Sequence, residues 1–219
     1  MTIQSTAGML FQTASANRYT WDENFPGYCA DVQLRQGNEV YSGQILVNSD
    51  FSVEVTGVTN QQVEEGINVQ LEEIVTRRQR TDIQRLYGQH EFTLDESDGE
   101  VSVLIKGESL DAQYQIRDRQ IYQEKRVMGR MAVIIDTLET LDTGAGYIAT
   151  RYDVTFCNSQ TQEVDTVLRF TDSYEFFGNY YILTKQAIAE YENPVNDSAI
   201  SMTEFSYSNI KLLETAAIR

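Results

Sequence analysis

The chain has 219 residues, of which 41% are hydrophobic and 23% charged, the balance of a folded chain rather than a disordered one. Its formal charge of −16 argues against general binding to nucleic acid or anionic membranes, because binding to phosphate needs a basic surface. No segment approaches the roughly 20 apolar residues of a transmembrane helix. The N-terminus also lacks the basic and apolar regions of a signal peptide, so we expect a cytoplasmic location.

The length predicts a single domain over residues 1–219, because all-β domains of this size are often undivided. The only two cysteines, Cys29 and Cys157, lie far apart in the sequence. Disulfides are rare in proteins that are not exported. We therefore predict that both cysteines are reduced, packed thiols.

A helix over Thr2–Ala16 is the first predicted element, because apolar residues recur there at helical spacing. Hydroxyl side chains near its start are candidate caps. A polar and aromatic connection, Asn17–Gly27, follows, and it contains the only tryptophan, Trp21. Alternation of apolar residues then predicts a meander of three strands with one apolar face, which needs a cover. The candidate caps are Thr2, Ser5 and Thr6, and the strands are Tyr28–Leu34, Tyr41–Val47 and Phe51–Val55.

A second, longer helix is predicted to supply this cover. Thr59 can cap it, and Gln62 stands at the position of a capping box. An apolar stripe at helical spacing indicates a buried face. We expect the helix to reach at least Arg77 and to continue for another turn or two before Gly88. The stripe consists of Val63, Ile67, Leu71, Ile74 and Val75.

From His90 onward the pattern is almost entirely that of strands, with Asp98–Gly99 as a strong hairpin signal. A sheet of about a dozen antiparallel strands cannot stay flat, because the twist between strands accumulates. We therefore predict an α+β, mostly β fold, with a single wide curved antiparallel sheet that forms a half-barrel or an open barrel. The N-terminal helix and the longer helix would cover its concave face.

Two stretches of the chain carry a resemblance to a known family. NRYTWDENFPGYCADVQLRQGNEVYSG and LDTGAGYIATRYDVTF closely resemble an uncharacterised family of cyanobacterial and plant-chloroplast proteins of similar length. The resemblance implies a photosynthetic organism, with the periphery of thylakoids as an alternative location. It brings no assigned activity, ligand or catalytic residue. In the order of its elements the chain also resembles the LolA-type lipoprotein carriers, open antiparallel half-barrels that hold acyl chains.

Motifs for catalysis or metal binding do not stand out. His90 is the only histidine and no GxSxG sequence accompanies it, so we predict no Ser-His-Asp site and leave the role of His90 open. One histidine and two distant cysteines do not match the usual zinc ligand sets. In LDTGAGY, Gly144 and Gly146 are interpreted as turn and bulge glycines rather than as part of a protease motif. We predict no catalytic residue, metal site or cofactor.

Two clusters of arginine stand out against the acidic background, one at the end of the long helix and one on a later hairpin. Local salt bridges and favourable charge at a helix C-terminus would explain them. The alternative is a patch for an anion or a protein partner, because guanidinium groups suit carboxylate and phosphate. The candidate patch residues are Arg77, Arg78, Arg80, Arg85, Arg117, Arg119, Arg126 and Arg130.

Aromatic residues gather in the connection before the first strand. They either pack in the core or form one wall of an apolar pocket, with acidic and polar groups at its mouth. Because two helices would not fill a wide concave face, we expect a cavity there. The candidate ligand-binding residues are Tyr19, Trp21, Asp22, Phe25, Tyr28, Ile67, Leu71, Tyr114 and Tyr147.

Three functional hypotheses of different classes follow. The first, our working hypothesis, is a soluble binding or carrier module for an apolar or pigment-like ligand in a photosynthetic organism. The second is a protein interaction or assembly factor without a small ligand. The third is a lyase- or isomerase-type enzyme acting on a bound tetrapyrrole or lipid, which no sequence motif selects.

Overall fold

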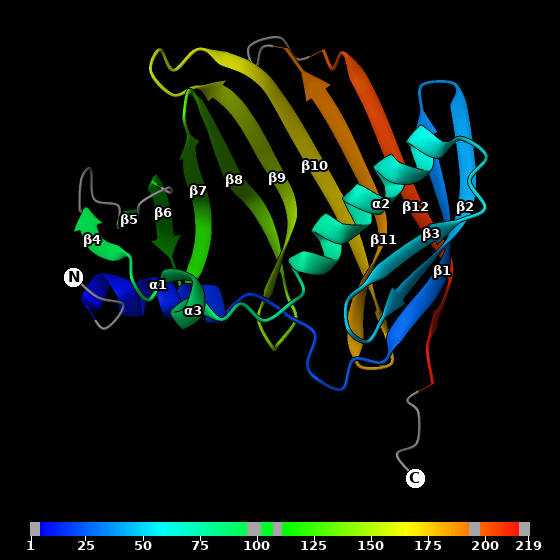
Figure 1. The fold of residues 1–219 in the computed structure, drawn as a ribbon, viewed down its shortest axis with the longest axis horizontal. Helices are drawn as coiled ribbons and strands as arrows, with labels where there is room; N and C mark the ends of the chain where they lie inside the picture. Colours follow the sequence, from blue (N-terminus) through cyan, green and yellow to red (C-terminus); the bar gives the residue numbers. More distant parts are fainter. Residues whose placement is uncertain (1–4, 96–101, 107–110, 193–197, 215–219) are drawn as a thin grey trace. The chain divides into compact units, whose positions relative to one another are not determined.

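The computed structural model describes residues 5–95, 102–106, 111–192 and 198–214, and within them it has three helices and twelve strands (Figure 1). None of the described helices is both long and apolar enough to cross a membrane. The helices are α1 (Thr6–Ala16), α2 (Gln61–Thr76) and α3 (Ile83–Tyr87). The strands are β1 (Gly27–Gln36), β2 (Glu39–Asn48), β3 (Val53–Thr56), β4 (Glu91–Asp95), β5 (Ser102–Lys106), β6 (Asp111–Arg117), β7 (Gln120–Met128), β8 (Met131–Asp142), β9 (Tyr147–Asn158), β10 (Val164–Phe177), β11 (Tyr180–Tyr191) and β12 (Ser201–Leu212).

The strands form one antiparallel sheet in the order β3-β2-β1-β12-β11-β10-β9-β8-β7-β6-β5-β4. Consecutive strands are neighbours in the sheet except β3 and β4, and β12 returns to pair with β1, where Tyr207 lies opposite Val32. Strands β3 and β4 end the order, so the sheet is open. The predicted mostly β fold, with a wide open antiparallel sheet and a longer helix after the third strand, is confirmed.

The chain divides into two compact units, which are described separately below. The first unit comprises Met1–Tyr19, Thr81–Thr171 and Ala189–Ile200, and the second comprises Thr20–Arg80, Asp172–Ile188 and Ser201–Arg219. The single domain over residues 1–219 stays a prediction.

In the first unit, α1 packs on the strands β4 to β7. Ser5 caps this helix, because its hydroxyl oxygen accepts a hydrogen bond from the backbone N–H of Gly8 at 3.1 Å. Phe11 is buried on the strand-facing side, and its ring centroid lies 4.7 Å from that of Tyr114 and 5.9 Å from that of Phe92. Burial of such a side chain contributes about 1.5–3 kcal/mol, so α1 is an integral part of this core.

In the second unit, α2 contacts β3 and presents its predicted apolar stripe to the interior. Ile67 and Leu71 are fully buried. The predicted cap at Thr59 is wrong by one residue: the side-chain oxygen of Asn60 accepts hydrogen bonds from the backbone N–H groups of Gln62 and Val63. Asparagine is a favoured cap because its short side chain reaches these unpaired groups.

The predicted continuation of the long helix toward Gly88 is also wrong. Helix α2 ends at Thr76, and the separate helix α3 begins at Ile83. The backbone N–H of Trp21 donates to the carbonyl of Arg78 at 2.8 Å. A continuous helix would need that carbonyl for its own i to i+4 hydrogen bond. The connection before β1 therefore supplies a partner for a carbonyl just after the end of α2.

Several smaller predictions can be compared with this fold. Cys29 and Cys157 are free thiols, as predicted. Gly144 and Gly146 have positive φ angles of 77° and 138°, and a side chain on Gly146 would meet the carbonyl oxygen of Asn17 at 2.6 Å, so both act as turn residues. The turn at 98–99, most of the predicted loop at 193–198 and the start of the first predicted helix lie outside the described residues. Strands β4 and β5, on either side of the 98–99 turn, pair in antiparallel fashion.

Candidate functional site

The aromatic residues of the connection pack against one another in the second unit. Trp21 stacks on Phe25 with ring centroids 4.1 Å apart, and Phe51 extends the stack 5.9 Å from Phe25. Tyr28 meets the edge of Trp21 at 6.1 Å. The indole N–H of Trp21 donates to the carbonyl of Tyr181 at 3.2 Å, so its polar atom is satisfied. We call Trp21, Phe25 and Phe51 the aromatic stack.

Asp22 and Tyr19 are two further residues of the predicted pocket, and their surroundings differ. The carboxylate of Asp22 accepts hydrogen bonds from the hydroxyl of Tyr180 at 3.0 Å and from the backbone N–H of Asn24 at 2.9 Å. It therefore holds the connection onto β11. Tyr19 is buried in the first unit, where its backbone N–H donates to the carbonyl of Tyr147 at 2.9 Å.

A buried polar cluster joins α2 to the strands of the second unit. Gln70 of α2 donates through its amide to Gln186 of β11 at 2.8 Å, and Gln186 donates to the carboxylate of Asp172 of β10 at 2.9 Å. The hydroxyl of Tyr174 donates to the other carboxylate oxygen at 3.3 Å. Arg78, just after α2, donates to the Tyr174 hydroxyl at 3.3 Å. We call these five residues the polar cluster.

The polar cluster contains a carboxylate that is removed from water, which disfavours its ionised form. Asp172 is 7% exposed and Gln186 is 1% exposed. Burial raises the pKa of Asp172 to about 6, although the hydrogen bonds and the positive charges of Arg77 and Arg78 act in the opposite direction. Burial also raises the pKa of Tyr174 to about 12. Asp172 is therefore mostly ionised at neutral pH and becomes protonated in mild acid.

Tyr207 of β12 belongs to the same unit, and its buried polar atom is unused. The residue is 6% exposed, and its hydroxyl has no hydrogen-bond partner within the residues that the structure describes. Burial raises its pKa well above the usual value, and Tyr28, Asp172 and Tyr174 add to the effect. A buried polar group without a partner costs about 1–3 kcal/mol, and such groups are rare in native cores. This hydroxyl is therefore a candidate for a ligand contact.

The other two predicted pocket tyrosines belong to the first unit. Tyr114 packs against Phe11, and the hydroxyl of Tyr147 accepts a hydrogen bond from the backbone N–H of Ile121 at 3.0 Å. Tyr147 thus has a structural partner for its polar atom. The predicted pocket residues are divided between two cores, with Trp21, Phe25, Tyr28, Ile67 and Leu71 in the second unit and Tyr19, Tyr114 and Tyr147 in the first.

The predicted arginine patch contains residues with different environments. Arg78 is buried, and its guanidinium lies 5.3 Å from the centre of the Tyr174 ring, so it belongs to the polar cluster. Arg117 lies over the ring of Tyr122 at 4.6 Å, and Arg126 pairs with the buried Glu124. The remaining patch residues are exposed and stay candidates for contact with a partner: Arg77, Arg80, Arg85, Arg119 and Arg130.

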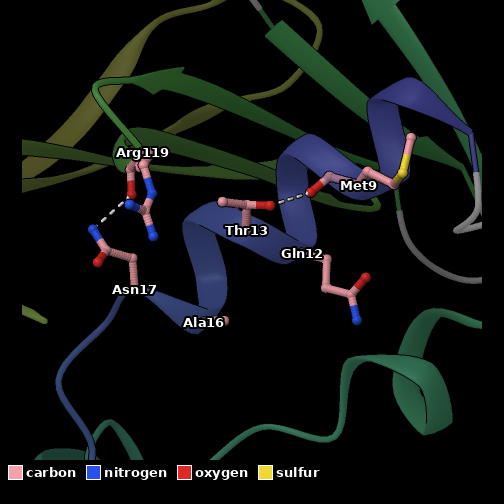
Figure 2. Close-up of a pocket in the computed structure, with 6 residues that line it drawn as sticks. All are labelled: Met9, Gln12, Thr13, Ala16, Asn17 and Arg119. Carbon is pink, nitrogen blue, oxygen red and sulfur yellow. Dashed lines mark hydrogen bonds between the residues drawn. The ribbon is translucent and has the colours of Figure 1, made fainter. Parts of the chain in front are cut away.

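A shallow depression beside α1 exposes one of these arginines (Figure 2). Its volume is about 530 Å³. The amide of Asn17 donates to the backbone carbonyl of Arg119 at 3.0 Å, which fixes the turn between β6 and β7 to the end of α1. Met9, 52% exposed, adds an apolar side chain. The depression is lined by Met9, Gln12, Thr13, Ala16, Asn17 and Arg119.

A second open depression, of about 560 Å³, lies on β1, β2, β3 and β12 in the second unit. Asp31 lines it, and its carboxylate accepts hydrogen bonds from the amides of Asn209 at 2.7 Å and Gln44 at 3.4 Å. These bonds lower the pKa of Asp31, so this carboxylate is well satisfied. Neither depression is lined by a residue of the predicted apolar pocket.

Comparisons with known proteins give a family but no activity. The family model described as protein of unknown function (DUF3386) matches residues 2–213, and no curated protein matches the chain. Similar solved structures include a DUF1329 family protein from Desulfovibrio piger, with 10% identity, 94% of this chain and 90% of that chain covered, and a TM-score of 0.25. They also include the MucA/MucB complex of Pseudomonas aeruginosa, with 7% identity, 93% of both chains covered and a TM-score of 0.26. Such low TM-scores support no statement about function.

Proposed function

The chain belongs to the DUF3386 family of proteins of unknown function, and from its own residues we propose that the second unit is a binding module for an apolar or pigment-like small molecule. The observation that carries the proposal is the buried hydroxyl of Tyr207, which has no partner in the described part of the chain. A bound molecule with a hydrogen-bonding group would supply that partner.

The surroundings of Tyr207 combine the two kinds of surface that ligand sites use. Small-molecule sites are mostly apolar and contain a few well-placed polar groups. Tyr28 connects both kinds here, because its ring meets the aromatic stack at Trp21 and its electrostatic influence reaches the Tyr207 hydroxyl. The polar cluster adds a buried carboxylate, whose charge also acts on the Tyr207 hydroxyl.

Helix α2 is the element that would admit the ligand. Its apolar stripe covers the interior, and two side-chain contacts connect the helix and the residue just after it to the strands, Gln70 to Gln186 and Arg78 to Tyr174. Hydrogen bonds of this kind contribute about 0.5–1.5 kcal/mol each, so they can break and re-form when the helix moves. We propose that displacement of α2 opens the space next to Tyr207.

A fluorescence titration tests this proposal, because Trp21 is the only tryptophan and lies in the aromatic stack. A panel of long-chain alcohols, fatty acids and tetrapyrroles is titrated, and at least one class should change the Trp21 emission saturably. Tyr207→Phe should weaken its binding about tenfold, the value of one ordinary hydrogen bond. Tyr147→Phe is the matched control: it also removes a buried hydroxyl, but one that Ile121 already uses, and binding should be unchanged.

Two results would count against the proposal. If no probe of the panel changes the emission, the second unit does not bind these molecules. If Tyr207→Phe and Tyr147→Phe bind equally well, the unused hydroxyl of Tyr207 does not contact the ligand.

A second candidate function, an interaction factor, is favoured by the depression beside α1. Arg119 is exposed there on a turn that Asn17 holds in place, and Met9 is exposed on α1. This combination suits an acidic protein segment with an apolar residue. A single partner captured from host lysate and identified by mass spectrometry should be lost with Arg119→Glu and retained with Arg130→Glu, a charge reversal on a different exposed turn. Equal capture by both variants would reject this depression as the binding surface.

A further inference from the structure

The turn between β6 and β7 has a backbone conformation that its residues rarely adopt. Asp118 and Arg119 both have positive φ angles, of 52° and 61°. The hairpin closes directly around them, because Arg117 pairs with Gln120. A two-residue turn with both central residues in the left-handed region favours Asn-Gly, since glycine has no side chain to clash there. An arginine at the second position therefore makes this turn less stable than it could be.

Other hairpin turns of the chain meet the same demand with glycine. Gly37, Gly129 and Gly178 each begin a two-residue turn, with φ angles of 57°, 63° and 59°. A side chain on Gly37 or Gly129 would meet no atom within 4 Å, so the backbone angle alone explains glycine there. Of these four turns, the one without glycine contributes Arg119 to the depression beside α1. Backbone strain of this kind is typical of functional sites.

Arg119 is fixed at one end of the depression. The amide of Asn17 donates to its carbonyl at 3.0 Å, which ties the strained turn to the end of α1 (Figure 2). Arg119 is the only charged residue among the six that line the depression, and its guanidinium pairs with no carboxylate of the described residues. A guanidinium fork suits a carboxylate, which accepts two parallel hydrogen bonds from it.

Met9 lies at the other end of the depression, as Figure 2 shows. It precedes Asn17 by eight residues, and a helix rises 1.5 Å per residue, so roughly 12 Å separates the apolar end from the charged end. Short segments do not form stable helices in water, so a partner segment would bind in an extended form. Such a segment advances about 3.3 Å per residue, and residues four positions apart share a face and span roughly 13 Å.

Resting on the second candidate function, we infer that Arg119 is retained against the stability of its turn because it anchors a carboxylate of the partner. The partner is an extended segment with an apolar residue four positions from an acidic one. The acidic side chain pairs with Arg119, and the apolar one packs against Met9. Thr13 and Ala16 line the depression between them with small side chains, which leaves room for the backbone of the segment. Arg119 is therefore the residue that determines specificity for an acidic partner.

Arg119→Gly tests the strain and the contact in one variant. Relief of the strained turn should raise the Tm by about 2–4 °C. The probe is an end-blocked peptide in which three serines separate a leucine from a glutamate, titrated into the protein and followed by NMR. Loss of the guanidinium should weaken its binding at least about tenfold. Arg130→Gly is the matched control: it removes an exposed arginine from a turn of the same unit whose left-handed position is already glycine, Gly129, and neither quantity should change.

The peptide itself supplies two further controls. With glutamine in place of the glutamate, the parent protein and Arg119→Gly should bind the peptide equally weakly, because the pair is then broken on the other side. With two serines the leucine and the glutamate point to opposite faces, and with five they lie roughly 20 Å apart. Both peptides should bind the parent protein at least about threefold more weakly.

The outcomes separate the inference from the second candidate function. A Tm that falls or stays the same with Arg119→Gly overturns the inference, and a fall would mean that the guanidinium supports the negative end of α1. Peptide binding that Arg119→Gly leaves intact overturns Arg119 as the anchor. If no peptide binds the parent protein, the inferred partner chemistry is wrong, whereas the function itself fails only if Arg119→Glu and Arg130→Glu capture the partner equally.

Discussion

Among the described residues, each unit buries one carboxylate, and the two carboxylates have different hydrogen-bond partners. In the first unit, Glu124 is 6% exposed and pairs with Arg126 and with Arg18, whose guanidinium lies at 3.4 Å. In the second unit, Asp172 is 7% exposed and accepts its hydrogen bonds from an amide and a phenol. Two nearby cations compensate the charge of Glu124. The carboxylate of Asp172 keeps part of its desolvation cost, which raises its pKa.

The tyrosine hydroxyls repeat this difference. Tyr147 of the first unit has a backbone partner, and Tyr207 of the second has none within the described residues. A core selected for stability alone would satisfy such groups or replace them. The contrast holds for these two pairs of groups and not for whole cores, because Ser15 and His90 of the first unit also have a buried side-chain atom without a hydrogen-bond partner among the described residues.

The largest expected effect comes from removing the apolar cover of the second unit. Leu71 is fully buried in the stripe of α2, so Leu71→Ala should lower the free energy of unfolding by about 2–5 kcal/mol. Val69 on the same helix is 55% exposed, and Val69→Ala should cost less than about 0.5 kcal/mol. Urea denaturation followed by circular dichroism measures both. A small loss for Leu71→Ala would mean that α2 does not pack as a cover.

The paired carboxylate of the first unit should be costly to neutralise. Glu124→Gln removes the negative charge between Arg18 and Arg126, and we expect a loss of about 1–3 kcal/mol. Both arginine side chains are more than 40% exposed, which limits the loss because water can solvate them. Chemical denaturation at neutral pH measures the loss. A variant as stable as the parent protein would remove the contrast between the two carboxylates.

Neutralising Asp172 should raise the free energy of unfolding rather than lower it. The folded state holds a proton more tightly than the unfolded state, whose pKa is near the ordinary 3.8, because the folded pKa is about 6. The stability of the protein therefore falls as pH rises from about 4 to about 6, and the penalty is complete above that range. Asp172→Asn should thus stabilise the protein by about 1–3 kcal/mol at neutral pH.

The pH dependence of this stabilisation is the sharper measurement. The difference in unfolding free energy between Asp172→Asn and the parent protein should grow from about pH 4 to about pH 6 and then stay constant. Denaturation curves at a series of pH values report it. A difference that is independent of pH would show that Asp172 titrates normally, and the two carboxylates would then be equivalent.

The smallest expected effect is kinetic and concerns the two thiols. Cys157 of the first unit is 2% exposed, whereas Cys29 of the second is only partly buried and lines the depression on β1, β2, β3 and β12. A thiol reagent should therefore modify Cys29 first in the native protein, and both in denaturant. Stepwise labelling followed by mass spectrometry distinguishes them. Labelling of Cys157 first would show that the first unit is the one that opens more readily.

Much of the fold could be predicted because it depends on local alternation and spacing. The strand pattern from Tyr28 onward and the stripe of α2 give both the elements and their buried faces. The break after α2 could not be predicted, because the carbonyl of Arg78 is taken by Trp21, a residue 57 positions earlier in the chain. Contacts of this range leave no periodic signal.

The polar part of the candidate site was missed for a related reason. Gln70 and Gln186 are 116 residues apart, and a polar residue in a strand is usually interpreted as solvent-facing. The alternation of side chains along β11 nevertheless gives a signal. Gln186 is separated by an even number of residues from Tyr180 and Ile182, which are both buried, so alternation alone places it on the inner face. The charge of Arg78 and its arginine neighbours favoured a place in the arginine patch, although its side chain is buried.

The pairing of β12 with β1 has a consequence for the order in which the protein is made. Ribosomes synthesise the N-terminus first, and Gly27–Gln36 is complete long before its partner Ser201–Leu212 emerges. One edge of β1 therefore stays unpaired until β12 is made, whereas most strands of the first unit can pair as soon as they are made. Nascent chains stopped before Ser201 should exchange the amide protons of that edge rapidly. The surface that Tyr207 contributes comes into existence only when synthesis is almost finished.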